Sequence, residues 1–282
     1  MNRRIILAVA LALTLAPQTF AAPTWLKDVA AAQKAAKAKN QLILVDMFAD
    51  WCGWCHRFER EVFPAEAFQK ATNDIVLLRL NTEDGKEGTQ FAQKFGVTSL
   101  PTFLLLTPDL TMAGMIRGYS PAPDFVRMLG ETRQKHQQFL TRVKNEANLG
   151  KDYMGRLELA KEFTSRSAFN ESDLRLRKLV AEKGVPVAIR DEAYYQLAVS
   201  QVMQSKFDDA VKTIAQLTSL SRLGESVEHA RLLRAEIYMQ QGKLAAARDE
   251  FLQFKAAFPN SPLNRNVDQV LPEIEKRLGG NN

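Results

Sequence analysis

The chain has 282 residues, a length that favours two domains, each large enough to bury a hydrophobic core. Hydrophobic residues make up 46% of the chain and charged residues 25%, which excludes a disordered or low-complexity protein. The formal net charge of +6 is a mild excess, and basic residues alternate with acidic ones along amphipathic stretches. This pattern is typical of a solvated surface and argues against nucleic-acid binding.

Residues 1–21 predict a secretory signal. Arg3 and Arg4 precede an apolar run at 5–16, and small residues occupy the cleavage positions. An uncleaved membrane anchor is the alternative, but this run is shorter than the about 20 residues that a spanning helix needs. We therefore expect a periplasmic or otherwise exported soluble protein that starts near Ala22 and has no stable membrane insertion.

Residues 22–130 alternate between strand and helix patterns. Three continuous apolar runs are typical of strands buried on both faces, at 41–48, 75–80 and 102–106. Helical patterns lie around them, at 25–39, 55–63, 89–95 and 124–129. This alternation predicts an α/β domain with a parallel core sheet, to which residues 112–118 add a candidate antiparallel strand.

Residues 131–282 show helical periodicity with short breaks and predict an all-α domain. Ala160, Ala198 and Ala235 recur in similar segments at intervals close to the 34-residue tetratricopeptide period. The last unit fits that pattern best, with matching positions at Tyr238, Gly242, Ala247, Phe251 and Pro259. An unrelated helical bundle is the alternative, but we favour tetratricopeptide-like helical repeats.

The only two cysteines stand in the segment Trp51-Cys52-Gly53-Trp54-Cys55. An exported protein that uses cysteines for stability usually spreads them along the chain, so this pair points to redox chemistry or to a metal. A strand runs into the pair and a helix follows, which predicts that Cys52 lies at a helix N-terminus with an exposed sulfur. There, unpaired N–H groups and the helix dipole stabilise a thiolate. Cys55, one turn later, is placed to resolve a mixed disulfide.

This segment resembles the thioredoxin family, and the resemblance extends to other positions. Asp46 falls where thioredoxins keep a buried carboxylate near the second cysteine, and Arg79 where they carry a lysine close to that acid. Leu100-Pro101-Thr102 matches the cis-proline loop that lies beside the dithiol and pairs with the substrate backbone. Gly118 matches a glycine of the last strand in that family.

Residues 48–129 are most similar to the soluble C-terminal domain of the DsbD-like proteins, which import reducing equivalents into the bacterial periplasm. Shared features are the Ala-Asp-Trp-Cys opening, the segment 61–63 and the extended loop 84–88. The spacer Gly53-Trp54 differs from the Gly-Pro of thioredoxin, and the membrane-spanning part of those importers has no counterpart here. The protein must therefore exchange electrons by meeting another protein.

The resemblance implies a thioredoxin fold and a protein thiol–disulfide oxidoreductase that leans towards reduction or isomerisation, without a cofactor or metal. It implies a redox disulfide between Cys52 and Cys55, protein thiol or disulfide substrates, and a membrane-protein electron donor. Catalytic roles fall to Cys52, Cys55, Asp46 and Pro101, and supporting roles to Trp51, Gly53, Trp54, Arg79 and Thr102. The helical repeats would bind partners. We expect a potential nearer the about −270 mV of thioredoxin than the about −120 mV of strong oxidants.

Several of these residues have simpler interpretations. Asp46 is otherwise a surface acid, although its apolar neighbours favour a buried carboxyl, which is costly without a purpose. Arg79 is otherwise a strand-edge cation. Trp51 and Trp54 are otherwise packing residues, but aromatic side chains beside a reactive pair favour partner contact. Pro101 is otherwise a trans proline at a strand start.

Other classes of function are less favoured. Residues 52–56 also fit the covalent haem attachment motif, but that motif requires neither a preceding buried strand nor a proline loop. A zinc site is incomplete, because two cysteines and His56 supply three ligands and the other histidines, His136 and His229, lie in the helical half. The non-enzymatic alternative is a periplasmic adaptor or chaperone whose repeats bind partners and whose thioredoxin fold is a scaffold. The intact cysteines favour the enzyme.

Overall fold

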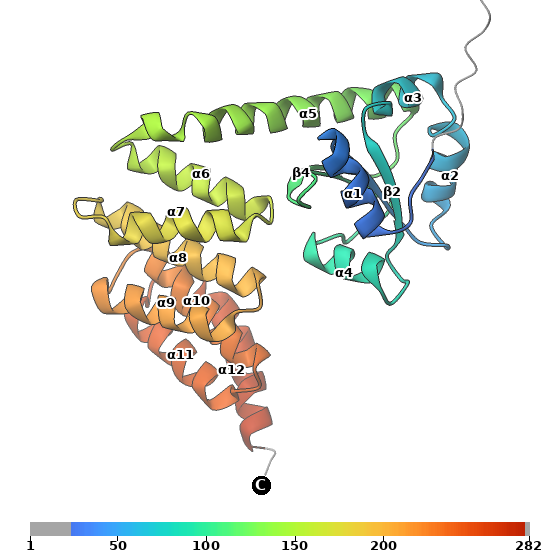
Figure 1. Cartoon of the computed structure of the whole chain (residues 1–282). Helices are drawn as coiled ribbons and strands as arrows, with labels where there is room; N and C mark the ends of the chain where they lie inside the picture. Colours follow the sequence, from blue (N-terminus) through green and yellow to red (C-terminus); the bar gives the residue numbers. More distant parts are fainter. Residues whose placement is uncertain (1–23, 280–282) are drawn as a thin grey trace, which may run out of the picture.

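The computed structural model describes residues 24–279, in which an N-terminal α/β part and a C-terminal array of helices are joined by the long helix α5, Ala122–Lys144 (Figure 1). The predicted secretory signal, residues 1–21, lies outside the described residues. Within residues 24–279 no helix is both long and apolar enough to cross a membrane.

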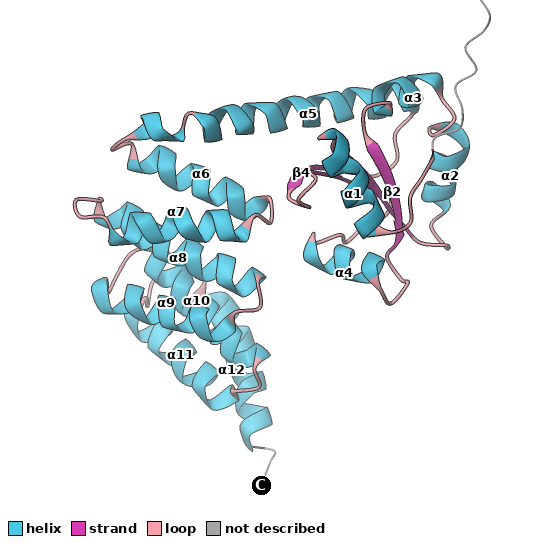
Figure 2. Cartoon of the chain, in the orientation of Figure 1, coloured by secondary structure: helices cyan, strands magenta, loops and turns pink. Residues whose placement is uncertain are grey.

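The sheet has four strands in the order β2-β1-β3-β4. Figure 2 draws the strands in magenta and labels β2 and β4. Their bounds are Ile43–Phe48 for β1, Val76–Asn81 for β2, Thr102–Leu106 for β3 and Met112–Arg117 for β4. β1 and β2 are parallel, whereas β3 is antiparallel to both β1 and β4. The prediction of an antiparallel strand at residues 112–118 is confirmed, but the prediction of a parallel core is wrong for β3.

The direction of β3 follows from the preceding connection. After α4, Glu87–Lys94, residues 95–101 bring the chain to the edge of the sheet where β1 ends, so that Thr102 at the start of β3 pairs with Met47. An apolar run indicates burial of a strand but carries no information about its direction. This direction places Pro101, the residue before β3, beside the end of β1. The chain continues from that end of β1 into the cysteine segment.

Both faces of the sheet are covered. Helix α1, Val29–Lys39, begins after Asp28, whose carboxylate accepts a hydrogen bond from the Ala31 N–H; this capping residue explains why the helix starts later than the predicted residue 25. Helices α1 and α4 pack on one face. Helices α2, Gly53–Glu61, and α3, Glu66–Thr72, pack with the start of α5 on the other, around a cluster of buried aromatic rings at Phe58, Phe63, Phe68, Phe103 and Phe125.

The C-terminal part is a stack of three helical hairpins followed by a single helix. The hairpins are α6–α7 (Tyr153–Ser165, Phe169–Ala181), α8–α9 (Val187–Met203, Phe207–Leu220) and α10–α11 (Glu225–Gln240, Leu244–Ala257), and α12 is Asn264–Gly279. Ala160, Ala198 and Ala235 are fully buried, and their small side chains allow close approach of the helices. The predicted all-α array is confirmed, and its first and weakest unit forms a helical hairpin, α6–α7.

The two parts meet at Arg166, which follows α6 and is 9% exposed. Its guanidinium donates hydrogen bonds to the carbonyl oxygens of Met112 (3.2 Å) and Ala113 (2.9 Å) on the edge strand β4, and the Met112 N–H donates to the Arg166 carbonyl. Glu162 pairs with the guanidinium at 2.9 Å, and the Phe139 ring of α5 lies 4.1 Å from it. Arg166 therefore anchors the helical array to the sheet.

Replacing Arg166 with alanine is expected to lower the free energy of unfolding by about 3 kcal/mol, because two backbone carbonyls and a carboxylate lose a buried partner. Urea unfolding followed by circular dichroism measures the change. The matched control is Arg156→Ala, which removes a mostly buried arginine whose partner, Glu182, lies within the array. An equal loss of stability in both variants would show that the contact of Arg166 with β4 does not stabilise the fold.

Candidate functional site

Cys52 is the N-cap residue of α2, and it is joined to Cys55 by a disulfide. The backbone N–H of Cys55 donates to Cys52 Sγ at 3.2 Å, and the Cys52 carbonyl accepts from the N–H groups of Cys55 and His56. The sulfur of Cys52 therefore lies where the first turn of the helix presents unpaired donors and positive dipole charge. This environment favours a thiolate at Cys52 once the disulfide is reduced.

The prediction that the Cys52 sulfur is exposed is wrong for the disulfide form. Cys52 is only 4% exposed and Cys55 1%, because Phe48, Ala49 and Leu100 pack around the pair. The surface is open at Gly53, the residue after Cys52, where an added Cβ would meet no atom within 4 Å.

The proline loop lies beside the disulfide. The Leu100–Pro101 peptide is cis, and the Leu100 side chain packs against the cysteine pair. The Pro101 carbonyl accepts a hydrogen bond from the Gly118 N–H at 2.9 Å, and the buried Thr102 donates its hydroxyl to the Ser99 carbonyl at 2.7 Å. These bonds fix the loop at the start of β3 and the end of β4, and Leu100 of the loop lies against the cysteine pair.

Asp46 lies inside β1 and is 2% exposed. Its Oδ2 is 3.0 Å from Arg79 Nε, an ion pair without hydrogen-bond alignment, and its Oδ1 has no hydrogen-bond partner. Burial raises the pKa of Asp46 from 3.8 to about 7, against the opposing effect of Arg79. At neutral pH this carboxyl is therefore poised between its two protonation states, as a proton-transfer group needs to be.

Arg79 connects Asp46 to α2. It stands opposite Asp46 in the β1–β2 register, its guanidinium lies 4.0 Å from the centre of the Phe48 ring, and it forms an ion pair with Glu59. Although burial acts in the opposite direction, the bonds and charges of Arg79 and His56 lower the pKa of Glu59. Glu59 was not among the predicted site residues, and its position one turn after Cys55 was the available signal.

His56 is turned away from the disulfide. Its Nε2 lies 2.8 Å from the Asp50 carbonyl oxygen and its Nδ1 3.4 Å from Glu59. The bond to the Asp50 carbonyl is the main reason that the pKa of His56 is raised. Both ring nitrogens of His56 are therefore engaged with these two oxygens.

Trp51 and Trp54 flank the cysteine pair and are 69% and 54% exposed. The Trp51 indole N–H donates to Glu83 at 2.9 Å, and the Trp54 ring lies against Tyr119. The Arg57 guanidinium lies over the Trp54 and Tyr119 rings, while the Arg57 side chain as a whole stays 44% exposed. Both tryptophans are surface side chains with a fixed neighbour.

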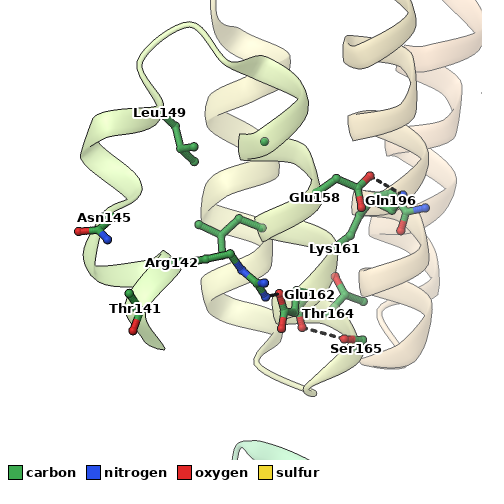
Figure 3. Close-up of a pocket in the computed structure, with 12 residues that line it drawn as sticks. Thr141, Arg142, Asn145, Leu149, Glu158, Lys161, Glu162, Thr164, Ser165 and Gln196 are labelled. Atoms are coloured by element: carbon green, nitrogen blue, oxygen red, sulfur yellow. Dashed lines mark hydrogen bonds and ion pairs between the residues drawn. The ribbon is translucent and has the colours of Figure 1, made fainter. Parts of the chain in front are cut away.

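A second candidate site is a groove of about 800 Å³ between the C-terminal end of α5, helix α6 and Gln196 of α8 (Figure 3). Its charges are paired within its walls, Arg142 with Glu162 and Lys161 with Glu158. Helix α5 starts near the dithiol and is about 35 Å long, so the groove is remote from the cysteines. Among the described residues no group of three or more metal-ligating side chains is found.

A mixed sheet with a cis-proline loop, and a cysteine pair at the start of a helix, define the class of thioredoxin-like proteins. Residues 29–133 match the family model of the thioredoxin-like domain, and residues 192–220 and 229–261 match that of the tetratricopeptide repeat. The chain therefore carries a thioredoxin-like domain followed by tetratricopeptide repeats. The two matched repeats lie in the second and third hairpins.

Relatives in sequence include the thiol:disulfide interchange protein DsbD of Pasteurella multocida, which is 33% identical over 100 residues, and that of Pseudomonas fluorescens, 31% identical over 110 residues. The matches cover 34% and 38% of this chain but only 17% and 19% of those proteins. The predicted resemblance to DsbD-like proteins is confirmed.

Similar solved structures include the oxidoreductase DsbH, with 13% identity and a TM-score of 0.39 over 45% of this chain and 95% of that chain. Another is the oxidised C-terminal domain of Neisseria meningitidis DsbD, with 17% identity and a TM-score of 0.34 over 39% of this chain and all of that chain.

Proposed function

We propose that the protein is an exported thiol–disulfide oxidoreductase that reduces or isomerises disulfides of partner proteins through Cys52 and Cys55. The observation that carries this proposal is the disulfide at the start of α2, where the Cys55 N–H donates to Cys52 Sγ. The buried Asp46 and the adjacent proline loop support it. Residues 22–130 would form the catalytic domain and residues 131–282 the partner-binding domain.

The reductive cycle has two exchange steps. The Cys52 thiolate attacks one sulfur of the partner disulfide, forms a mixed disulfide and releases the other partner sulfur as a thiolate. Cys55 then loses its proton and attacks Cys52 Sγ, which re-forms the Cys52–Cys55 disulfide and releases the second partner thiolate. Two electrons pass to the partner, and we assign the proton of Cys55 to Asp46. A membrane-protein donor would return the electrons.

We expect a reduction potential near that of thioredoxin, about −270 mV. The helix start stabilises one thiolate, but the carboxylates of Asp46 and Glu59 disfavour a second negative charge nearby. His56 does not compensate, since it is directed to Asp50 and Glu59. Equilibration with a glutathione or dithiothreitol series measures the potential. A value above about −150 mV would make the protein a disulfide-forming oxidase instead.

A second candidate function is that of an adaptor or chaperone in which the repeats do the binding, and the groove between α5, α6 and α8 favours it. Solenoids use such surfaces for partner proteins. Thr141→Trp would fill the groove from α5, whereas Leu140→Trp adds the same ring at an exposed position of α5 outside the groove. If the protein is an adaptor, the Thr141→Trp variant should lose its partner in affinity capture and the Leu140→Trp variant should keep it. Both variants should reduce a small disulfide at the native rate.

A further inference from the structure

Trp54 is exposed, yet its position is fixed by its neighbours. It is the second residue after Cys52, on the first turn of α2. Its ring centre lies 5.3 Å from that of Tyr119, and the Arg57 guanidinium lies 5.6 Å from the indole centre on the same helix. A side chain that is 54% exposed and held by two neighbours is preorganised for contact.

The support of Trp54 is itself rigid. Arg57 Nε donates to both carboxylate oxygens of Glu61, at 2.9 and 3.0 Å, and the Tyr119 hydroxyl donates to the same carboxylate. The Arg57 guanidinium lies 4.7 Å from the Tyr119 ring centre, and the buried Phe58 ring makes an edge contact with Tyr119 at 5.6 Å between ring centres. We call Trp54, Arg57, Glu61 and Tyr119 the aromatic platform.

The chemistry at Cys52 brings a partner onto this platform. A disulfide keeps the two cysteine Cα atoms within about 4.4–6.8 Å, so the chain of any protein joined to Cys52 must pass close to the start of α2. The open space above Gly53 leaves that route free. The side chain next to the partner's cysteine is then within reach of the Trp54 indole.

The charges of the platform indicate which side chain fits. Hydrogen bonds from Tyr119 and Arg57 lower the pKa of Glu61, so Arg57 and Glu61 form a neutral pair and offer no free charge. A cationic side chain on Trp54 would meet Arg57, which already lies over the ring. An apolar side chain, by contrast, would cover exposed indole surface, and Trp, Tyr and Arg are the residues that dominate binding at protein interfaces.

We propose that the aromatic platform selects partner disulfides whose cysteines are flanked by a large apolar side chain. This inference rests on the proposed function and names the substrate class of the same site. Trp54 is the contact residue, and Arg57, Glu61 and Tyr119 position it.

The test uses the reduced full-length protein and ten-residue peptides closed by one disulfide, which differ only in whether leucine, serine, lysine or aspartate stands beside each cysteine. Hydroxyethyl disulfide serves as a probe that has no side chain beside its sulfur atoms.

The expected kcat/KM for the leucine peptide is about tenfold above that for the other three peptides. Trp54→Ala should remove this preference through KM, and Tyr119→Phe, which keeps the ring but removes the bond to Glu61, should weaken it. In Leu223→Ala, which removes an exposed apolar side chain of the helical array away from the dithiol, the ratio should persist.

Equal rates for the leucine and serine peptides, or a faster lysine peptide, would overturn the proposal. So would a Trp54→Ala variant that slows hydroxyethyl disulfide as strongly as the leucine peptide, because Trp54 would then act on the dithiol itself. If the native protein reduces none of the probes, the proposed function fails first, and that result is distinct from a loss of preference.

Discussion

Replacing Cys52 with serine is expected to abolish disulfide exchange, whereas replacing Cys55 with serine is expected to leave partner proteins covalently trapped on Cys52. Only Cys52 lies at the helix start, where its Sγ accepts the Cys55 N–H and a thiolate is stabilised. Without Cys55, no thiol follows one turn later to release the mixed disulfide. Non-reducing electrophoresis and intact mass of the trapped species measure the result.

The two variants control for each other, because each removes one buried sulfur from the same pair and loses the same disulfide. Changes in stability are therefore shared, and only the chemistry distinguishes them. Mixed disulfides formed by the Cys52→Ser protein would reverse the assignment of the nucleophile. Residual turnover in the Cys52→Ser protein would place the reaction elsewhere in the chain.

The elements of the α/β part could be predicted from the sequence because buried strands need continuous apolar runs. β3 begins and ends at the predicted residues, and β1 and β2 deviate by one or two. The direction of β3 could not be predicted, since it depends on how residues 95–101 return to the sheet. Helix α5 runs on to Lys144, well beyond the predicted residue 129. Its later turns are polar on most sides, and their few apolar residues pack against the helical array.

The candidate site shows the same limit. Burial of Asp46 could be predicted from its apolar neighbours, and the position of Cys52 from the strand that precedes it and the helix that follows. Contacts between elements could not be predicted. The register of β1 and β2 and the helical phase of α2 together determine that Arg79 contacts both Asp46 and Glu59. For the same reason the contact between Arg57 and Tyr119 could not be predicted, since Tyr119 comes from a distant part of the chain.

Asp46→Asn is expected to slow disulfide exchange at least tenfold at pH 7 while it makes the protein more stable at alkaline pH. The loss of activity follows if the carboxyl accepts the proton of Cys55, because the amide cannot. The gain in stability follows from burial, which raises the pKa of Asp46 to about 7 in the folded protein. Between pH 3.8 and about 7 the folded state therefore binds more protons than the unfolded chain, and stability falls as the pH rises through this window.

The pKa difference, which already includes the opposing effect of Arg79, corresponds to at most about 4 kcal/mol above pH 7. Part of it is offset because the amide of the variant is still a buried polar group. We expect Asp46→Asn to raise the free energy of unfolding by about 2 kcal/mol at pH 8 and to give no gain at pH 4, where Asp46 is protonated in the folded state. Urea unfolding at both pH values measures this difference.

The control for this experiment is Asp109→Asn, which neutralises a carboxylate that is 80% exposed and paired with Lys37 on the surface of the same domain. It should change stability by less than about 0.5 kcal/mol at either pH and leave the pH–rate profile intact. The combined readout separates two roles of Asp46. A stability gain without a change in the pH–rate profile would make Asp46 a buried charge with no part in proton transfer, and a loss of stability at pH 8 would show that the ion pair with Arg79 outweighs the cost of burial.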